Sequence, residues 1–209
     1  MKVSLKSITP DIETNIVEIA RVSSKRKDKS EQPEKLINYL IKNKHWSPFE
    51  HGFITMEIVT SKAIGIQLLR HRSFTFQEFS QRYAQVTEIE PIELRRQADK
   101  NRQSSEDVFD PVIDEVVYAS DLINGIIEEC INGYKSLIQF GVAKECARMV
   151  LPMATQTTIY MTGPVRSWIH LINIRDDSHA QKEAQLIAKE MKKIFIEECP
   201  LISKALGWE

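Results

Sequence analysis

The stretch GFITMEIVTSKAIGIQLLR, residues 52–70, changes from one type of local structure to another partway along. Residues 52–60 are rich in β-branched and aromatic side chains, which predicts a strand. Ser61 can cap a helix that continues to Arg70, because its hydroxyl can accept a hydrogen bond from an N–H group of the first turn. The elements predicted on either side mix helices and strands without a regular βαβ repeat. We therefore expect an α+β fold, with a small antiparallel or mixed sheet flanked by helices.

Apolar periodicity predicts the elements around this stretch. A second strand is expected at residues 155–162, where β-branched side chains recur. The segment from His71 to Arg82 loses the helical period and is expected to be a loop, as is the polar run Lys25–Lys29. Further helices are expected at residues 11–21, from Ser30 and Pro33 to about His45, and at 112–140, 143–151, 165–174 and 180–198.

The helix expected at residues 112–140 is long for a chain of this size, about 40 Å in length. Apolar residues recur along it, among them Val116, Ile127 and Ile138. One small sheet cannot cover so much apolar surface. We therefore expect this helix to associate with other helices in an oligomer, in which a second subunit covers part of its face.

The region at about residues 87–111 is the most polar part of the chain, and it contains the basic run Arg95–Arg102. We interpret it as an excursion from a single domain that spans residues 1–209, either mobile or folded as a surface helix. An RNA-binding module would need aromatic side chains between the basic ones. The run has none, so a solvated segment is the preferred interpretation.

Composition excludes several classes of protein. The 209 residues carry 28 Lys and Arg against 29 Asp and Glu, a net charge of −1, which argues against a general nucleic-acid binder. No apolar stretch reaches the ~18 residues of a membrane span. The first residues also lack the apolar core of a signal peptide. We therefore expect a cytoplasmic protein with no membrane partner.

Residue types and spacing exclude several chemistries. The seven glycines form neither a Rossmann nor a Walker phosphate loop. His45 and His51 are a poor metal-binding pair because a proline lies between them, and no metal site is expected. The cysteines Cys130, Cys146 and Cys199 are odd in number and far apart, which predicts buried, reduced thiols in helices rather than disulfides or metal ligands.

Basic residues are concentrated between Arg70 and Arg82. Ser80 and Arg82 are two residues apart, so in an extended segment both side chains point to one side, where a hydroxyl and a guanidinium can bind a phosphate dianion. The alternative is that these cations only complement the macrodipole of the preceding helix. Arg148 lies among apolar residues just before Pro152 and needs either an internal carboxylate or an anionic ligand.

Four sequence blocks together resemble the flavin-dependent thymidylate synthases. The signature block is Arg70-His71-Arg72, followed after seven residues by Ser80-x-Arg82. The other blocks are His45-x-x-Pro48-Phe49-Glu50-His51, Ala147-Arg148-x-Val150-Leu151-Pro152 and Arg175-x-Asp177-Ser178-His179-Ala180-Gln181. Gln77 stands where members of the family often have Asn, and Pro164 and His170 stand where some have Asn.

The resemblance implies a methyltransferase that converts dUMP to dTMP by reductive methylation. It implies bound FAD, 5,10-methylenetetrahydrofolate as the carbon donor and NADPH as the reductant, with tetrahydrofolate released. It also implies a homotetramer with active sites at the subunit interfaces. A non-catalytic nucleotide-binding regulator is the alternative, because it would need the same arginines without a flavin.

The resemblance also implies which residues form the site. The residues expected around dUMP are Gln67, Leu68, Leu69, Arg70, Glu78, Phe79, Ser80, Gln81, Arg82, Arg148 and the catalytic Arg175, which would polarise the uracil ring. The residues expected around FAD are Ser47, Arg70, His71, Arg72, Glu78, Pro164, Val165, Arg166 and His170, with His45 and His179 near the flavin or the folate. No cysteine lies in the polar parts of these blocks, so carbon transfer is expected to pass through the flavin. Ser80 has no evident base and is expected to bind phosphate.

Overall fold

The computed structural model describes residues 1–22 and 33–208, which divide into two compact units. Unit 1 comprises Met1, residues 59–68 and residues 78–158, and unit 2 comprises residues 2–58, residues 69–77 and the chain from Ile159 onward. The loop expected at Lys25–Lys29 and the helix start expected at Ser30 lie outside the described residues. The single domain expected from the sequence stays a prediction.

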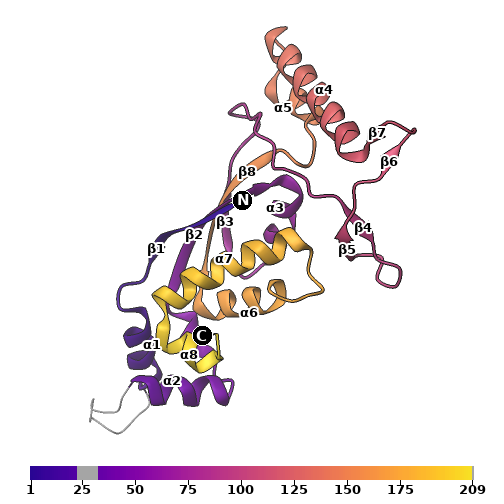
Figure 1. The fold of residues 1–209 in the computed structure, drawn as a ribbon. Helices are drawn as coiled ribbons and strands as arrows, with labels where there is room; N and C mark the ends of the chain where they lie inside the picture. The colour runs from indigo at the N-terminus through magenta and orange to yellow at the C-terminus, as the bar shows by residue number, and fades with distance from the viewer. Residues whose placement is uncertain (23–32, 209) are drawn as a thin grey trace. The chain divides into compact units, whose positions relative to one another are not determined.

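The main sheet has four strands in the order β1-β2-β8-β3 (Figure 1), and most of it belongs to unit 2. The strands are β1 (Lys2–Ile8), β2 (Phe53–Ser61), β8 (Gln156–Pro164) and β3 (Thr75–Glu78). Buried residues alternate with less buried ones along β2 and β8, so one face of these strands forms the core. The α+β class and the two strands expected at residues 52–60 and 155–162 are confirmed.

Two strands differ from the expectation. β1 precedes the first predicted element, and β3 lies within the segment for which a loop is predicted, so the loop is wrong at Thr75–Glu78. β3 is short and polar, and it joins the sheet by pairing with β8, which lies far along the chain. Local periodicity does not reveal a strand whose partner is so distant.

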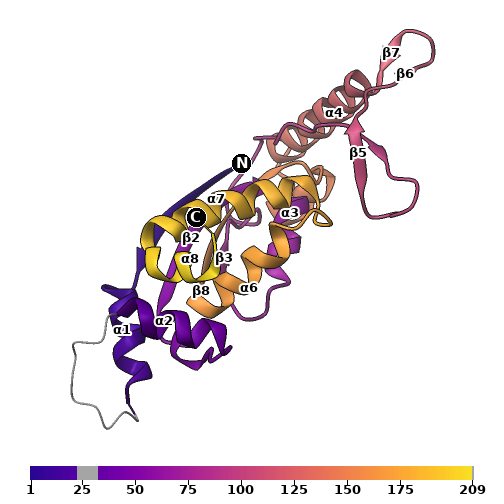
Figure 2. The same cartoon turned by 60° about the horizontal axis from the view of Figure 1, so that its bottom comes forward.

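In unit 2, α7 contacts both β1 and α6 (Figure 2). The helices of this unit are α1 (Ile12–Ala20), α2 (Pro33–Lys42), η1 (Ser47–Glu50), α6 (Val165–Arg175), α7 (Lys182–Glu198) and α8 (Pro200–Leu206). The fully buried Trp168 fixes α6, because its indole N–H donates to the carbonyl oxygens of Ile54 and Gly163, at 3.1 Å each. The predicted helices of this unit are confirmed. α8 is an addition, and Pro200 in its first turn is a typical start signal.

Unit 1 contains two hairpins, the helix α4 and nearly all of α3. Its elements are α3 (Lys62–Leu69), β4 (Arg95–Gln97), β5 (Ser105–Val108), β6 (Val112–Ile113), β7 (Val117–Tyr118), α4 (Ala119–Gln139), α5 (Lys144–Ala147) and η2 (Arg148–Val150). The helices expected at residues 61–70 and 143–151 are confirmed, the second in two short pieces.

The polar excursion is not a surface helix. β4 and β5 pair antiparallel, and the Arg96 guanidinium lies 3.9 Å from the centre of the Phe109 ring and 3.4 Å from the Asp107 carboxylate. These cross-strand contacts favour the hairpin over a helix, which would separate the paired residues.

The long helix begins later than expected. α4 starts at Ala119, so its length is about 32 Å. The preceding residues form the hairpin of β6 and β7, with Asp114 and Glu115 in the left-handed region at φ 51° and 63°. Residues at positive φ are not compatible with a right-handed helix, so the helix begins only after this hairpin and not at the residue that the apolar pattern predicts.

The three cysteines are free thiols, as expected, but they differ in burial. Cys199 is buried, and burial raises the pKa of its thiol far above the usual range. Cys130 is half-buried and Cys146 is exposed, so the expectation of burial is wrong for Cys146. Its helix, α5, has four residues and buries only Ala147.

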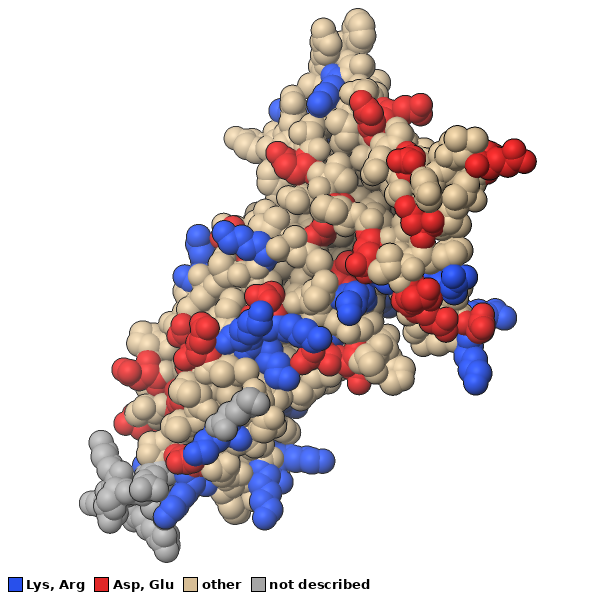
Figure 3. Space-filling model, viewed as in Figure 1, with Lys and Arg blue, Asp and Glu red and all other residues tan. Residues whose placement is uncertain are grey.

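Acidic and basic side chains are interspersed on the face shown in Figure 3. Within the described residues, no helix combines the length and the apolar character needed to cross a bilayer.

Candidate functional site

A cavity of about 760 Å³ lies in unit 2 beside α6. The residues that line it are Trp46, Glu50, Ser73, Pro164, Arg166, Ser167, Ile169, His170 and Asn173. Three of the residues expected around FAD are therefore brought together here, namely Pro164, Arg166 and His170. Of the others, Val165 is fully buried and Ser47 is exposed. We call this the α6 cavity.

The first turn of α6 is held firmly in place. The backbone N–H of Val165 donates to the carbonyl oxygen of Gly52 at 2.8 Å. The ring of Phe74 packs so closely on Gly163 that a Cβ atom there would collide with it. The free N–H groups of the first turn carry partial positive charge and suit an anion.

Arg166 adds a full charge to the α6 cavity. Its Nη1 lies 2.7 Å from Oε1 of Glu50, and both side chains remain partly exposed. The ion pair therefore contributes little to stability. It holds the guanidinium in the cavity wall, where an anionic ligand can compete with Glu50.

His71 and Arg175 form a hydrogen-bonded pair in unit 2. The Nε–H of Arg175 donates to Nε2 of His71 at 3.1 Å, so His71 is neutral with its proton on Nδ1. Burial, followed by the charges of Arg175 and His170, lowers the pKa of His71 to about 4. Burial, followed by the charge of Arg70, lowers the pKa of Arg175. His71 is thus an uncharged acceptor that orients the Arg175 guanidinium, whereas Arg70 and Arg72 are exposed.

A second cavity, of about 430 Å³, lies in unit 1 and includes Ser80 and Arg82. The full set that lines it is Ser80, Arg82, Tyr83, Ala143, Lys144 and Glu145. The segment is a turn rather than an extended strand, because the N–H of Tyr83 donates to the carbonyl oxygen of Ser80 at 3.0 Å. We call this the Ser80 cavity.

The charged side chains of the Ser80 cavity come from two parts of unit 1. Nη2 of Arg82 lies 3.2 Å from Oε2 of Glu145, and both side chains are more than half exposed. Nζ of Lys144 donates to the carbonyl oxygen of Tyr83 at 3.1 Å. The cavity therefore contains two cations and one carboxylate.

Two buried nitrogen atoms in unit 1 have no hydrogen-bond partner among the residues that the structure describes. They are Nε2 of Gln81 and Nε of Arg148. An unsatisfied buried donor is unfavourable by about 1–3 kcal/mol. For Arg148, no ion pair with a carboxylate is found in the described part of the chain, which favours the anionic ligand over the internal partner.

Glu78 is held at the end of β3 by two other elements of unit 1. Nζ of Lys62, the first residue of α3, lies 2.8 Å from Oε1 of Glu78. The hydroxyl of Thr157, on β8, donates to the same oxygen at 2.9 Å. The other residues expected around dUMP in this part of the chain are Gln67, Leu68 and Leu69 on α3 and Phe79 directly after β3.

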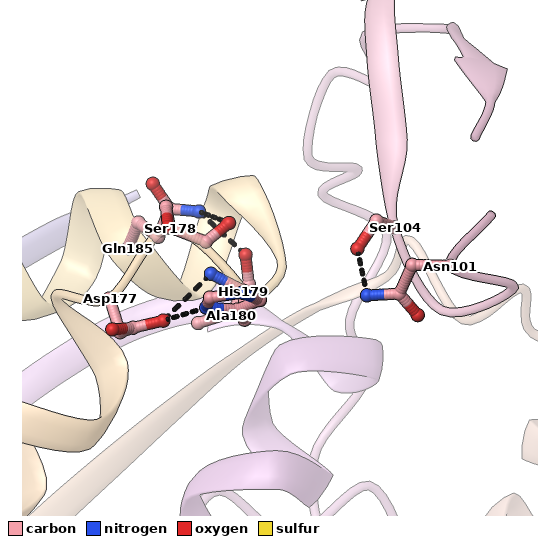
Figure 4. A network of polar contacts seen from close by, with 7 residues as sticks. All are labelled: Asn101, Ser104, Asp177, Ser178, His179, Ala180 and Gln185. Atoms are coloured by element: carbon pink, nitrogen blue, oxygen red, sulfur yellow. Dashed lines mark hydrogen bonds and ion pairs between the residues drawn. The ribbon is translucent and has the colours of Figure 1, made fainter. Parts of the chain in front are cut away.

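The loop after α6 is fixed by its own hydrogen bonds (Figure 4). The backbone N–H of His179 donates to Oδ1 of Asp177 at 2.8 Å, its Nδ1 lies 2.6 Å from the same oxygen, and both contacts lower the pKa of Asp177. The His179 ring is 83% exposed. His45 is exposed and packs edge-on against Tyr39. Neither histidine lines the α6 cavity or the Ser80 cavity.

The expected site residues thus fall into two sets. Unit 1 contains Gln67, Leu68, Glu78, Phe79, Ser80, Gln81, Arg82 and Arg148, and unit 2 contains His45, Ser47, Leu69, Arg70, His71, Arg72, Pro164, Val165, Arg166, His170, Arg175 and His179. The sequence did not predict roles for Trp46, Glu50, Ser73, Asn173, Lys62, Thr157, Lys144 or Glu145. Glu50 lies inside a recognised block, which is a usable signal, whereas Lys62 and Thr157 become visible only through their contacts with Glu78.

Comparisons with known proteins agree with the sequence blocks. A sequence model of the family described as thymidylate synthase complementing protein matches residues 4–201. A probable flavin-dependent thymidylate synthase of Paramecium bursaria Chlorella virus 1 is 47% identical over 174 residues, covering 83% of this chain and 80% of that relative. A flavin-dependent thymidylate synthase of Synechocystis sp. is 44% identical over 189 residues, covering 90% and 86%. One from Thermosipho melanesiensis is 38% identical over 187 residues, covering 88% and 81%.

Proposed function

The chain belongs to the thymidylate synthase complementing protein family, and from this premise we propose that it is an FAD-dependent enzyme that makes dTMP from dUMP. In the full proposal, 5,10-methylenetetrahydrofolate donates the carbon, NADPH supplies the reducing equivalents and tetrahydrofolate is released. The observation that carries the proposal is the Ser80 cavity, in the same unit as two buried nitrogen donors that lack partners within the described residues.

The residues of unit 1 suit a nucleotide monophosphate. Ser80 and Arg82 line one cavity and offer a hydroxyl and a guanidinium to the phosphate. Arg148 and Gln81 each have a buried nitrogen to donate, and a ligand that accepts these bonds removes an unfavourable desolvation. In the proposed dUMP site, these four residues bind the phosphate. Glu78, which is close to Ser80 in sequence, contacts the uracil base.

The α6 cavity fits part of FAD. Its volume of about 760 Å³ is ample for a small-molecule ligand. Arg166 and the first turn of α6 provide positive charge for a pyrophosphate, while Trp46 and Ile169 provide apolar and aromatic surface. Ser47, His170 and the Arg70–Arg72 segment complete the proposed FAD-binding set. When bound, FAD supplies the redox and one-carbon carrier chemistry.

Arg175 is the proposed catalytic residue. His71 orients its guanidinium, which would stabilise negative charge that develops on the uracil ring and so activate the carbon to be alkylated. A cysteine nucleophile has no support in the described residues: Cys199 is buried with a raised thiol pKa, and neither Cys130 nor Cys146 lines the α6 cavity or the Ser80 cavity. Ser80 binds phosphate in this proposal and forms no covalent bond.

Assembly as a homotetramer, with active sites at the interfaces, is also part of the proposal. It is supported by apolar side chains that unit 1 leaves exposed on and after α4, including Leu122 at 46%, Ile126 at 51% and Phe140 at 85%. Burial of this surface against other copies would be favourable. A cytoplasmic location stays part of the same proposal.

The direct test is a turnover assay on the purified protein with dUMP, 5,10-methylenetetrahydrofolate, FAD and NADPH. We expect dTMP and tetrahydrofolate, and omission of FAD from flavin-stripped protein should abolish both. A protein that binds dUMP tightly but holds no flavin and releases no dTMP would instead be a nucleotide-binding regulator. Size-exclusion chromatography with light scattering tests the tetramer separately.

A further inference from the structure

Glu78 is held by an unsymmetrical clamp. Both of its donors, Nζ of Lys62 at 2.8 Å and the hydroxyl of Thr157 at 2.9 Å, bind Oε1. Within residues 1–22 and 33–208, the structure records no hydrogen bond to Oε2. One carboxylate oxygen is therefore committed to the protein, and the other is available to a ligand.

The clamp is rigid at its base. The backbone N–H of Lys62 donates to the carbonyl oxygen of Thr155 at 2.9 Å, and the N–H of Ala63 donates to that of Met153 at 3.1 Å. Thr157 is 2% exposed, so its hydroxyl has a fixed origin on β8. After Glu78, the N–H of Phe79 donates to the carbonyl oxygen of Thr158 at 2.9 Å. The three side chains of the clamp thus all start from backbone that is fixed by hydrogen bonds.

The ion pair of Lys62 and Glu78 is mostly buried. The two side chains are only 23% and 25% exposed, so water screens their attraction less than at the surface, and loss of one partner would leave the other charge partly desolvated. The charge-assisted hydrogen bond also selects one orientation of a carboxylate that otherwise rotates freely about its side-chain bonds. The pair therefore determines where Oε2 points, and a double-mutant cycle separates this effect from a loss of stability.

We propose that Lys62, which lies outside the recognised sequence blocks, is a positioning residue that holds Oε1 of Glu78 so that Oε2 faces the bound dUMP. This inference rests on the proposed function, in which Glu78 contacts ligand. Lys62 itself touches no ligand. Thr157 assists it by donating the second bond to the same oxygen.

The test measures kcat and KM for dUMP with the flavin-loaded enzyme. Lys62→Met keeps the length of the side chain and removes its charge, and it should lower kcat/KM by about tenfold or more, because misplacing a ligand-binding group has effects of this order. Lys62→Arg keeps a donor and should restore most of the loss. Thr157→Val keeps the side-chain volume, removes the hydroxyl and should give a smaller loss of the same kind.

A double-mutant cycle distinguishes positioning from a general structural role. In a Glu78→Ala background, Lys62→Met should have almost no further effect on kcat/KM, because the group it positions is absent. Lys204→Met is the matched control: it removes a lysine that also lies 2.8 Å from a carboxylate, that of Glu34, and should leave kcat/KM unchanged. If Lys62→Met does not fold, Thr157→Val is compared in the wild type and in Glu78→Ala instead. It should lower kcat/KM only where Glu78 is present.

The outcomes separate this inference from the proposed function. A wild-type enzyme that forms dTMP, with unchanged kcat/KM in Lys62→Met, would overturn the positioning role alone. Equal losses from Lys62→Met with and without Glu78 would overturn it as well. A wild-type protein that forms no dTMP contradicts the proposed function itself, and the role of Lys62 with it.

Discussion

The two ends of the Arg70–Arg82 segment differ in how their polar groups are satisfied. At the first end, in unit 2, His71 accepts a hydrogen bond from Arg175, and burial keeps it neutral. At the second end, in unit 1, Gln81 is buried with an amide nitrogen that has no partner in the described chain. The side chains at the first end are held by a hydrogen bond before any ligand binds, whereas the second end contains a buried donor that has no partner in the described chain. One motif therefore combines a preorganised part with a part that a ligand must complete.

The difference has a physical cause. A guanidinium that acts on a reacting ring must already point in the right direction, because reorganising it during the reaction would raise the barrier. A phosphate-binding group gains most when it exchanges an unsatisfied state for a charge-assisted hydrogen bond. In the proposed function, Arg175 would meet the first requirement through its hydrogen bond to His71, and Arg148 would meet the second through its unpartnered Nε.

Removing an unpartnered buried donor of unit 1 should have the largest effect, which is on the affinity for dUMP. Arg148→Ala should weaken dUMP binding by about 100-fold, because hydrogen bonds to charged groups contribute roughly 1.5–3 kcal/mol each. Isothermal titration with dUMP measures the affinity. The affinity of Arg148→Lys should fall between those of the wild type and Arg148→Ala. Arg102→Ala, an exposed arginine of the same unit, is the control and should bind dUMP like the wild type. Full affinity in Arg148→Ala would exclude Arg148 from the proposed phosphate site.

Releasing the preorganised end should have an intermediate effect. His71→Leu removes the acceptor for Arg175 and should lower kcat by about tenfold, while the affinity for dUMP changes less, because the guanidinium loses its orientation. His71→Gln places an amide oxygen near the position of Nε2 and should recover most of kcat. Steady-state kinetics checks both variants. Equal activity of His71→Leu and wild type would contradict the orienting role.

The neutral state of His71 predicts a pH dependence of stability. Its pKa is lowered from 6.5 to about 4 in the folded protein, so the unfolded chain binds the proton more readily. The contribution of neutral His71 to the free energy of unfolding is present in full above pH 6.5 and is lost as the pH falls from there toward 4. Thermal unfolding across this range should therefore show a steeper decline for the wild type than for His71→Gln. Parallel curves for the two proteins would show that His71 is not the group responsible.

The smallest effect is expected at the ion pair of Arg82 and Glu145. Glu145→Gln removes a carboxylate that competes with phosphate for Arg82, and should strengthen dUMP binding a few-fold. The free energy of unfolding should change by less than about 1 kcal/mol, because both side chains are exposed. Titration and urea denaturation measure the two quantities. Weaker binding in this variant would mean that Glu145 itself contacts the ligand.

Local sequence was sufficient where periodicity or a start signal is strong. β2, β8, α6 and α7 lie where the pattern of apolar and β-branched residues predicts them. It failed at β3, at the hairpin of β4 and β5, and over the first residues assigned to the long helix. In each case the deciding contact is with another strand, and such pairing has no fixed sequence signature.

The same division applies to the candidate site. The spacing of Ser80 and Arg82 would put both side chains on one side of an extended segment, but the segment is a turn. The two residues line one cavity because of that turn, and their binding of an anion stays a prediction. The apolar surroundings of Arg148 predict a need for a partner, and they leave open which kind. The contacts in unit 1 favour a ligand, because the described residues offer its Nε no acceptor.

By itself, the sequence determined the α+β class, most of the helices and the family, and it predicts which residues would bind an anionic nucleotide and a flavin. These follow from local periodicity and from blocks whose members are close along the chain. Only the tertiary structure decided that His71 is neutral and holds Arg175, and that Lys62 and Thr157 hold one oxygen of Glu78. Hydrogen-bond partners and burial set these properties, and both depend on residues that are distant in sequence and adjacent only after folding.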